Sequence, residues 1–300
     1  MTDGAASTHS TQGRRRTATL RDIPLLSMRR FEEVEDLKSV LRTAFPRTYV
    51  ALAKARLSFA MLVDQKSDYP HDGMKLYGKS LDFLNDPRFV QAYERGMNTG
   101  HHIGREKGSH DDIHNEYRVY LCCWAAANGA RLDGDFVECG VNTGITSVAI
   151  CNYVDFNRLG KTFFLFDTYN GIPIDQASEV ERKARAEESA RLYDECFELA
   201  KRNFAPWPSC VLVRGRIPDT LACHEIKRVA YLHLDMNIAA PEIAAIEHFW
   251  PRLVIGAVVM LDDYGFAQFR PQKDAMDAWA VAHGVSVATL PTGQGMIVKT

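Results

Sequence analysis

The sequence has no apolar run close to the roughly 20 residues that a membrane-spanning helix needs, and its first residues lack the apolar stretch of a secretion signal. It also has little excess charge, with a formal net charge of -2, and therefore no general attraction to nucleic acid or an anionic membrane. These absences predict a cytoplasmic protein that acts on a small molecule and binds neither nucleic acid nor membranes. The 300 residues, 46% of them hydrophobic, suffice for one large domain with an appendage.

The sequence also lacks any C-x-x-C pair, although it contains seven cysteines. An odd number of cysteines inside apolar or helical stretches predicts reduced, mostly buried thiols. Their spacing supports neither a zinc site nor a catalytic nucleophile.

The residue patterns divide the chain into three parts. Residues 1–20 are rich in Ser, Thr, Gly and Arg, which predicts a disordered tail. Residues 21–130 form a helical N-terminal extension, because apolar residues recur at helical spacing in segments 31–44, 47–63, 86–95 and 115–127. Residues 131–300 form an α/β domain with predicted strands at 135–139, 162–166, 210–214, 229–234, 254–261, 285–290 and 295–299.

The alternation of strands and helices after residue 130 predicts a mostly parallel, doubly wound, Rossmann-like sheet. Only residues 291–294 separate the last two strands, which is too few for a crossover, so these strands should form an antiparallel hairpin. A parallel sheet that ends in such a hairpin is the arrangement of class I methyltransferases. Ligands of such sheets bind beyond the carboxyl ends of the strands.

A glycine turn follows the first predicted strand and leads into a helix. Gly140 and Gly144 are spaced G-x-x-x-G, unlike the G-x-G-x-x-G that grips a dinucleotide pyrophosphate. Glu138 precedes the turn, where a carboxylate suits a cationic cofactor and would repel a pyrophosphate. The turn therefore predicts S-adenosylmethionine as cofactor, with Asn142 and Thr143 as further binding residues.

Two other strand ends are candidates for binding the nucleoside part of the cofactor. Asp167 ends the second strand next to the glycine turn, where it could accept hydrogen bonds from both ribose hydroxyls. The alternative is an aspartate that caps the following turn. Gly215 and Arg216 follow the third strand and are weaker candidates for framing the adenine.

Three carboxylates follow the fourth and fifth strands. These are Asp235, Asp262 and Asp263. Because neighbouring strands lie about 4.8 Å apart, the three should converge, and clustered carboxylates need a proton or a cation. Oxygen ligands of this kind suit Mg²⁺. The alternative is that Asp262 and Asp263 belong to a polar turn.

These motifs, in this order, resemble the macrocin and mycinamicin O-methyltransferase family, which includes the novobiose methyltransferase. The resemblance covers roughly residues 110–300 and rests on the segments around Glu138, Asp167, Asp235 and Asp262. It implies an enzyme that moves a methyl group from S-adenosylmethionine to a sugar hydroxyl, with Mg²⁺ held by Asp235, Asp262 and Asp263. Asn237 stands where those enzymes typically have a carboxylate, so the acceptor pocket should differ.

Several histidines are candidates for the site. Asp235 is the expected metal ligand and possible general base, and His233, two residues earlier on the same strand, is the second candidate base. The alternative for His233 is a hydrogen-bonded core histidine. Four more histidines lie in the polar loop before the α/β domain, where they either border the acceptor pocket or are solvated: His101, His102, His110 and His114.

Residues 177–203 predict one long charged helix over the cofactor cleft, acting as a lid or a dimer element, or else as an ordinary outer helix. Its expected apolar stripe comprises Val180, Ala184, Leu192, Cys196 and Leu199. The helical extension is a candidate homodimer face. The leading function is O-methylation of a hydroxyl of a sugar or secondary metabolite. The alternatives are a non-catalytic protein that has kept the fold, suggested by Asn237, and a nucleotide-dependent oxidoreductase, which Glu138 disfavours.

Overall fold

The computed structural model describes residues 39, 42–62, 67–101 and 113–300. The chain divides into two compact units, Met1–Lys66 and Ser67–Thr300. The predicted tail, most of the predicted helix 31–44, and His102 and His110 lie outside the described residues. Within the first unit, helix α2 (Pro46–Leu62) matches the predicted helix 47–63.

The second unit is built on a seven-stranded sheet whose strand order is β3-β2-β1-β4-β5-β7-β6. The strands from β1 to β5 are parallel, and β7 is antiparallel to both β5 and β6. Their bounds are β1 Asp135–Cys139, β2 Phe163–Asp167, β3 Cys210–Arg214, β4 Val229–Leu234, β5 Leu253–Leu261, β6 Ala288–Thr289 and β7 Gly295–Val298. The predicted doubly wound sheet with an antiparallel hairpin is confirmed, although β6 is shorter than the predicted strand 285–290.

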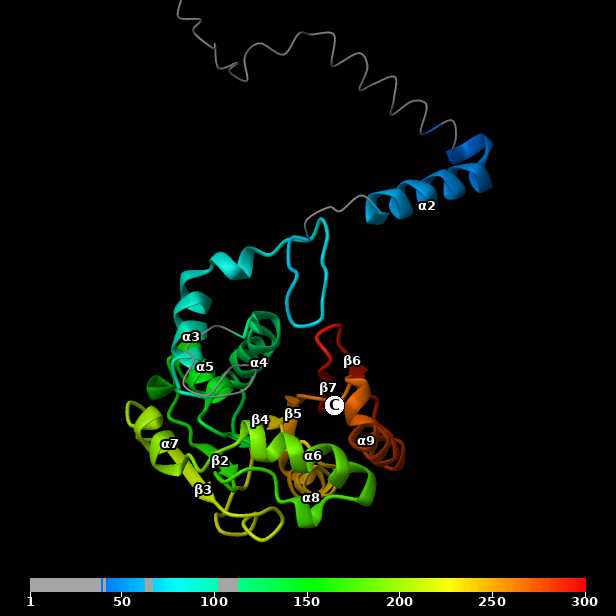
Figure 1. Cartoon of the computed structure of the whole chain (residues 1–300). Coiled ribbons are helices and arrows are strands. Elements are labelled where there is room, and N and C mark those ends of the chain that lie inside the picture. The colour runs from blue at the N-terminus through cyan, green and yellow to red at the C-terminus, as the bar shows by residue number, and fades with distance from the viewer. Residues whose placement is uncertain (1–38, 40–41, 63–66, 102–112) are drawn as a thin grey trace, which may run out of the picture. The chain divides into compact units, whose positions relative to one another are not determined.

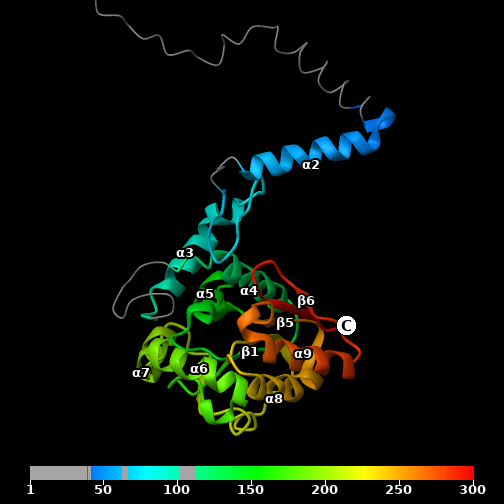
Figure 2. The ribbon, with the colours of Figure 1, turned by 45° about the vertical axis from the view of Figure 1, so that its right-hand side comes forward.

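Helices cover both faces of the sheet, as Figures 1 and 2 show. On one face lie α3 (Pro87–Met97), α4 (Glu116–Gly129) and α5 (Ile145–Tyr153), and on the other lie α8 (Ala239–Phe249) and α9 (Arg270–Ala282). Successive residues of a strand point to opposite faces, so Phe136 packs with α4 and α5 whereas Val137 packs with α8. Both faces of the parallel strands are therefore buried, as their continuous apolar sequences require.

The part of the predicted extension from residue 67 onward belongs to the same unit as the sheet. α3 packs against α5, and α4 packs against α5 and β5. Short 3-10 helices complete the unit at η1 (Asp82–Asn85), η2 (Phe156–Arg158), η3 (Ile174–Gln176), η4 (Trp250–Arg252) and η5 (Ala267–Phe269). Across the parts of the chain that the structure describes, no helix combines the length and apolar character needed to cross a membrane.

The prediction of one helix over residues 177–203 is wrong. The segment forms α6 (Glu179–Leu192) and α7 (Phe197–Phe204), because the backbone is extended at Tyr193. Before α7 the Cys196 amide donates to the Tyr169 carbonyl at 2.9 Å, which holds the chain away from a continuous helix.

The expected apolar stripe is confirmed only in part, because Cys196 is buried and Leu192 and Leu199 are partly buried. Its first two members are wrong: Val180 is 73% exposed and Ala184 is exposed, and the buried residues of α6 are Glu181 and Arg185. Polar contacts explain this: Glu181 accepts from the Ala239 amide at 2.7 Å, and the Arg185 guanidinium lies 4.0 Å from the centre of the Phe269 ring.

Candidate functional site

A cavity of about 390 Å³ lies at the carboxyl ends of the parallel strands. Its lining includes residues from the ends of β1, β2, β4 and β5, and from α4 and α6. β1 lies between β2 and β4 in the sheet, so the chain order reverses at this point. The cavity is therefore where open α/β sheets bind ligands, and its size is typical of a small-molecule site.

The two glycines of the predicted cofactor turn serve different purposes. Gly140 has φ +92, and a Cβ there would lie 1.8 Å from the Asp235 carbonyl oxygen. Gly144 has φ +101, precedes α5, and packs so closely against Phe204 that a Cβ would lie 2.7 Å from its ring. Both positions require glycine. The first brings the cofactor turn into contact with the residue that begins the carboxylate cluster.

Asp167 holds the same turn in place. One carboxylate oxygen accepts from the amides of Val141 and Asn142 at 2.5 and 2.7 Å. The other accepts from the Tyr169 amide at 2.6 Å and from the Thr168 hydroxyl at 3.2 Å. Asp167 therefore caps the turn that follows it, as the alternative interpretation predicted. Asp167 also lines the cavity, so it could reach a ligand there, and ribose binding stays a prediction.

Glu138 is a buried carboxylate in the lining of the cavity. The side chain is 2% exposed, and Oε1 lies 3.0 Å from His233 Nδ1. Oε2 has no hydrogen-bond partner among the described residues, and Glu138 lines the cavity. A buried carboxylate with a free oxygen favours a ligand that carries positive charge or donates hydrogen bonds.

The remaining cofactor candidates differ in position. Asn142 and Gly215 line the cavity, whereas Thr143, Gly144 and Arg216 are not among its lining residues. The Thr143 hydroxyl lies 2.9 Å from that of Thr99, and Arg216 Nη1 donates to Asp175 Oδ2 at 2.6 Å near the surface. In this arrangement Thr143 and Gly144 support the turn, and Arg216 is engaged elsewhere.

The three predicted carboxylates converge. Ligand oxygens of Asp235, Asp262 and Asp263 all lie within 4.8 Å of one another, and all three residues line the cavity. Burial and repulsion from the other two aspartates raise the pKa of Asp235 well above its usual value. Burial and repulsion from Asp262 raise the pKa of Asp263 to about 7. Such a set of oxygen donors fits a hard divalent cation, which would relieve the repulsion.

Arg118 on α4 supplies part of the missing positive charge, and sequence analysis did not identify it. Its Nη2 pairs with Asp262 Oδ2 and lies 3.3 Å from Asp263 Oδ1. The available signal was one cation within the first turn of an otherwise apolar helix, whose following residues include Val119, Cys122 and Cys123. One guanidinium only partly neutralises three carboxylates, so negative charge remains that a bound cation could balance.

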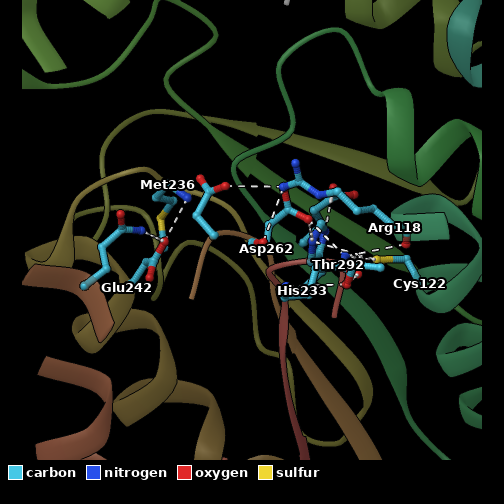
Figure 3. Close-up of polar contacts among 11 residues, drawn as sticks. Arg118, Cys122, His233, Met236, Glu242, Asp262 and Thr292 are labelled. Atoms are coloured by element: carbon cyan, nitrogen blue, oxygen red, sulfur yellow. Dashed lines mark hydrogen bonds and ion pairs between the residues drawn. The ribbon is translucent and has the colours of Figure 1, made fainter. Parts of the chain in front are cut away.

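Asp262 is distinguished from its neighbours by a network of side chains (Figure 3). Gln294 Nε2 donates to Asp262 Oδ1 at 3.1 Å, and His233 Nε2 lies 3.6 Å from the same oxygen. Although burial opposes ionisation, Arg118, His233 and Gln294 lower the pKa of Asp262 below its usual value. Asp262 therefore loses its proton more readily than Asp235 and Asp263.

His233 sits between the two halves of the site. It is fully buried, it pairs with Glu138 through Nδ1 and faces Asp262 through Nε2, and it is not among the residues that line the cavity. Asp235, in contrast, opens to the cavity. Of the two candidate bases, only Asp235 can meet a ligand without rearrangement of the core.

Another buried carboxylate, Glu242 on α8, fixes the loop after β4 (Figure 3). It accepts from the Met236 amide at 3.1 Å and from Gln272 Nε2 at 2.6 Å, and burial raises its pKa to about 8. In the same loop Asn237 adopts φ +63, a left-handed conformation that asparagine tolerates better than most residues. Asn237 therefore suits the backbone conformation of this loop, in addition to replacing a carboxylate by a neutral amide.

The two described loop histidines, His101 and His114, are not among the residues that line the cavity. His101 is buried, and His114 stacks on His71 with ring centres 4.2 Å apart. Ile113 and Asn115, on either side of His114, do line the cavity. From the segment predicted as a lid, Glu188 and Tyr193 line the cavity as well, and its movement stays a prediction.

Comparisons with known proteins agree with this geometry. The sequence model of the Macrocin-O-methyltransferase (TylF) family matches residues 120–289, which is more than half of the chain. Mycinamicin III 3''-O-methyltransferase of Micromonospora griseorubida is 23% identical over 175 residues, covering 55% of this chain and 67% of that protein.

Two solved structures are also similar. The O-methyltransferase NovP superposes with a TM-score of 0.58 at 20% identity, covering 69% of this chain and 88% of its own. The calicheamicin methyltransferase CalS11 superposes with a TM-score of 0.52 at 16% identity, covering 74% of this chain and 98% of its own. Both share the fold of the second unit.

Proposed function

Because the chain belongs to the macrocin O-methyltransferase family and is therefore a methyltransferase, we propose that it transfers the methyl group of S-adenosylmethionine to a hydroxyl of a sugar or another natural product, with Mg²⁺ in the carboxylate cluster. The observation that carries the proposal is the contact between Gly140 and the Asp235 carbonyl, which joins the glycine turn and the carboxylates in one cavity. Relatives named for mycinamicin III and calicheamicin favour a natural-product acceptor.

The cofactor half of the site supports a cationic nucleoside. Glu138 Oε2 is free to face positive charge, and the amides of the turn are held in position by Asp167. Gly215 lets the chain pass close to a bound base, because it has φ +148 and lines the cavity. S-adenosylmethionine supplies a methyl carbon that the sulfonium has already activated.

The acceptor half of the site has to position an oxygen and take its proton. Bound Mg²⁺ would be held by Asp235, Asp262 and Asp263 and would lower the pKa of the acceptor hydroxyl. Asp235 is the candidate that accepts the proton as the oxygen bonds to the methyl carbon and S-adenosylhomocysteine leaves, because it lines the cavity whereas His233 does not. Asp262 pairs with Arg118, while His233 lies between Glu138 and Asp262 and contacts both.

Two alternatives find less support. A non-catalytic protein was suggested by Asn237, but the left-handed backbone accounts for that residue and the three carboxylates are all in place. An oxidoreductase would bring a pyrophosphate against Glu138, whose free oxygen would repel it.

Calorimetry separates these functions. We expect the protein to bind S-adenosylhomocysteine with a micromolar or lower Kd and to show no heat with NAD. Glu138→Gln should weaken binding of the cationic S-adenosylmethionine more than that of neutral S-adenosylhomocysteine, because the carboxylate faces the charge. The exposed variant Glu225→Gln serves as the control. Binding of NAD, or no binding of S-adenosylhomocysteine, would contradict the proposal.

A further inference from the structure

A short hairpin, residues 67–78, reaches the cavity from outside the segment that matches the family. Tyr69 and Leu76 form an antiparallel bridge, and the Gly78 amide donates to Asp68 Oδ2 at 2.6 Å. The hairpin is anchored by Tyr69, which is 1% exposed and donates its hydroxyl to Glu116 Oε2 at 2.8 Å. Its tip therefore has a fixed position relative to the start of α4.

The tip of this hairpin carries Asp72, which lines the cavity together with Asn115 and Arg118 of the α4 region and with Phe266. Asp72 adopts φ +51, a backbone conformation that aspartate tolerates. Its Oδ2 is buried and has no hydrogen-bond partner among the described residues. A buried carboxylate oxygen without a partner is costly unless a ligand completes it.

Arg118 supplies the complementary atom. Its Nη2 is used by Asp262 and Asp263, but its Nε is buried and has no partner among the described residues. Arg118 and Asp72 interact electrostatically without forming an ion pair with each other: burial raises the pKa of Asp72, and Arg118 opposes the rise. Two residues of the cavity lining, Asp72 and Arg118, therefore have one acceptor and one donor without a partner among the described residues.

This pair of unused atoms selects a hydroxyl by its chemistry. A hydroxyl can donate to a carboxylate and accept from a guanidinium, whereas an ammonium cannot accept and a carboxylate cannot donate. Resting on the function proposed above, we propose that Asp72 is a specificity-determining residue, which accepts a hydrogen bond from a second hydroxyl of the acceptor while the first is methylated at the carboxylate cluster. The acceptor is then a polyol, as in a pyranose ring.

The test compares methyl α-rhamnopyranoside with its 2-deoxy, 3-deoxy and 4-deoxy derivatives, using S-adenosylmethionine with a tritiated methyl group. The variants are Asp72→Asn, which keeps the shape, and Asp72→Gly, which suits a positive φ. Asp68→Asn, in the same hairpin but outside the cavity lining, is the matched control. Binding of S-adenosylhomocysteine and the melting temperature verify that each variant is folded.

Among the deoxy derivatives that keep the methylated hydroxyl, one should lack the hydroxyl that contacts Asp72. Wild type should methylate the parent glycoside with kcat/KM roughly 10- to 100-fold above that for this derivative, the size expected for losing a hydrogen bond to a charged group. Asp72→Gly should lower kcat/KM for the parent by the same factor, mainly through KM, and leave that derivative unchanged. Equal losses for parent and deoxy compounds, or the same loss in Asp68→Asn, would overturn the assignment of Asp72 alone. If wild type binds S-adenosylhomocysteine but methylates no glycoside, the proposed acceptor class is wrong, and the role of Asp72 with it.

Discussion

Three aspartates of one cluster have different ionisation because their neighbours differ. Asp262 pairs with Arg118, accepts a hydrogen bond from Gln294 and faces the His233 ring. For Asp235, burial and repulsion from the other two aspartates raise the pKa. Charge is thus fixed on one carboxylate, and the other two are left to respond to a cation or a proton. This division suits a site in which Asp262 orients the metal and Asp235 takes a proton.

Glu242 gives a prediction at the residue scale, because its pKa is about 8 in the folded protein against 4.5 in an unfolded chain. Between these pH values the folded state keeps a proton that the unfolded state has released. The stability from this group is therefore full below about pH 4.5 and falls as pH rises to about 8. A shift of this size corresponds to at most about 5 kcal/mol.

Glu242→Gln imitates the protonated side chain and keeps an oxygen for the Met236 amide. Urea denaturation should give nearly equal stability for variant and wild type at pH 5, and a variant more stable by a few kcal/mol at pH 8.5. Glu247→Gln, a half-exposed residue of the same helix, provides the control and should show no such trend. A difference between Glu242→Gln and wild type that does not change with pH would refute the explanation.

At the scale of elements, the turn between β1 and α5 connects the proposed cofactor half of the cavity with the proposed acceptor half. Its geometry depends on the absence of a side chain at residue 140, where the chain touches the end of β4. The Asp235 amide in turn donates to the Cys139 carbonyl at 2.8 Å. A displacement of one strand end would therefore move both halves of the site.

Gly140→Ala should lower the free energy of unfolding by more than about 3 kcal/mol and weaken binding of S-adenosylhomocysteine, because the new Cβ meets backbone that cannot move aside. Gly160→Ala is a matched control: its φ is +64 and a Cβ there meets nothing within 4 Å. It should cost only the 1–2 kcal/mol or so of a left-handed alanine and leave ligand binding unchanged. Similar losses in the two variants would contradict the account of the turn.

The break between α6 and α7 shows where a helical pattern misleads. The spacing predicts an apolar stripe for this segment, yet Glu181 caps both α6 and the start of α8, and Arg185 packs on Phe269. Buried charges with specific partners cannot be read from spacing alone, because the partners come from other elements. The hydrogen bond from the Cys196 amide, which precedes α7, also goes to another segment, because its acceptor is the Tyr169 carbonyl.

At the scale of the whole molecule, sequence reasoning recovered what is encoded locally. The strands, the glycine turn and the three aspartates each lie within a short segment whose composition and order carry the signal, and the parallel topology brings their ends together. Arg118, Gln294 and Asp72 could not be found in this way. Arg118 is 144 residues from Asp262, and only the packing of α4 on the sheet places it there.

The central claim is that the methyl donor and the metal share one cavity. It can be tested by nuclear magnetic resonance with S-adenosylmethionine carrying a ¹³C methyl group and with Mn²⁺ in place of Mg²⁺. Mn²⁺ should broaden the methyl signal of the bound cofactor strongly in wild type and in the exposed control Asp133→Asn. In Asp235→Asn, which removes a cluster ligand, the broadening should require at least about tenfold more Mn²⁺. A methyl signal that stays sharp while Mn²⁺ binds, or equal broadening in Asp235→Asn, would contradict the account.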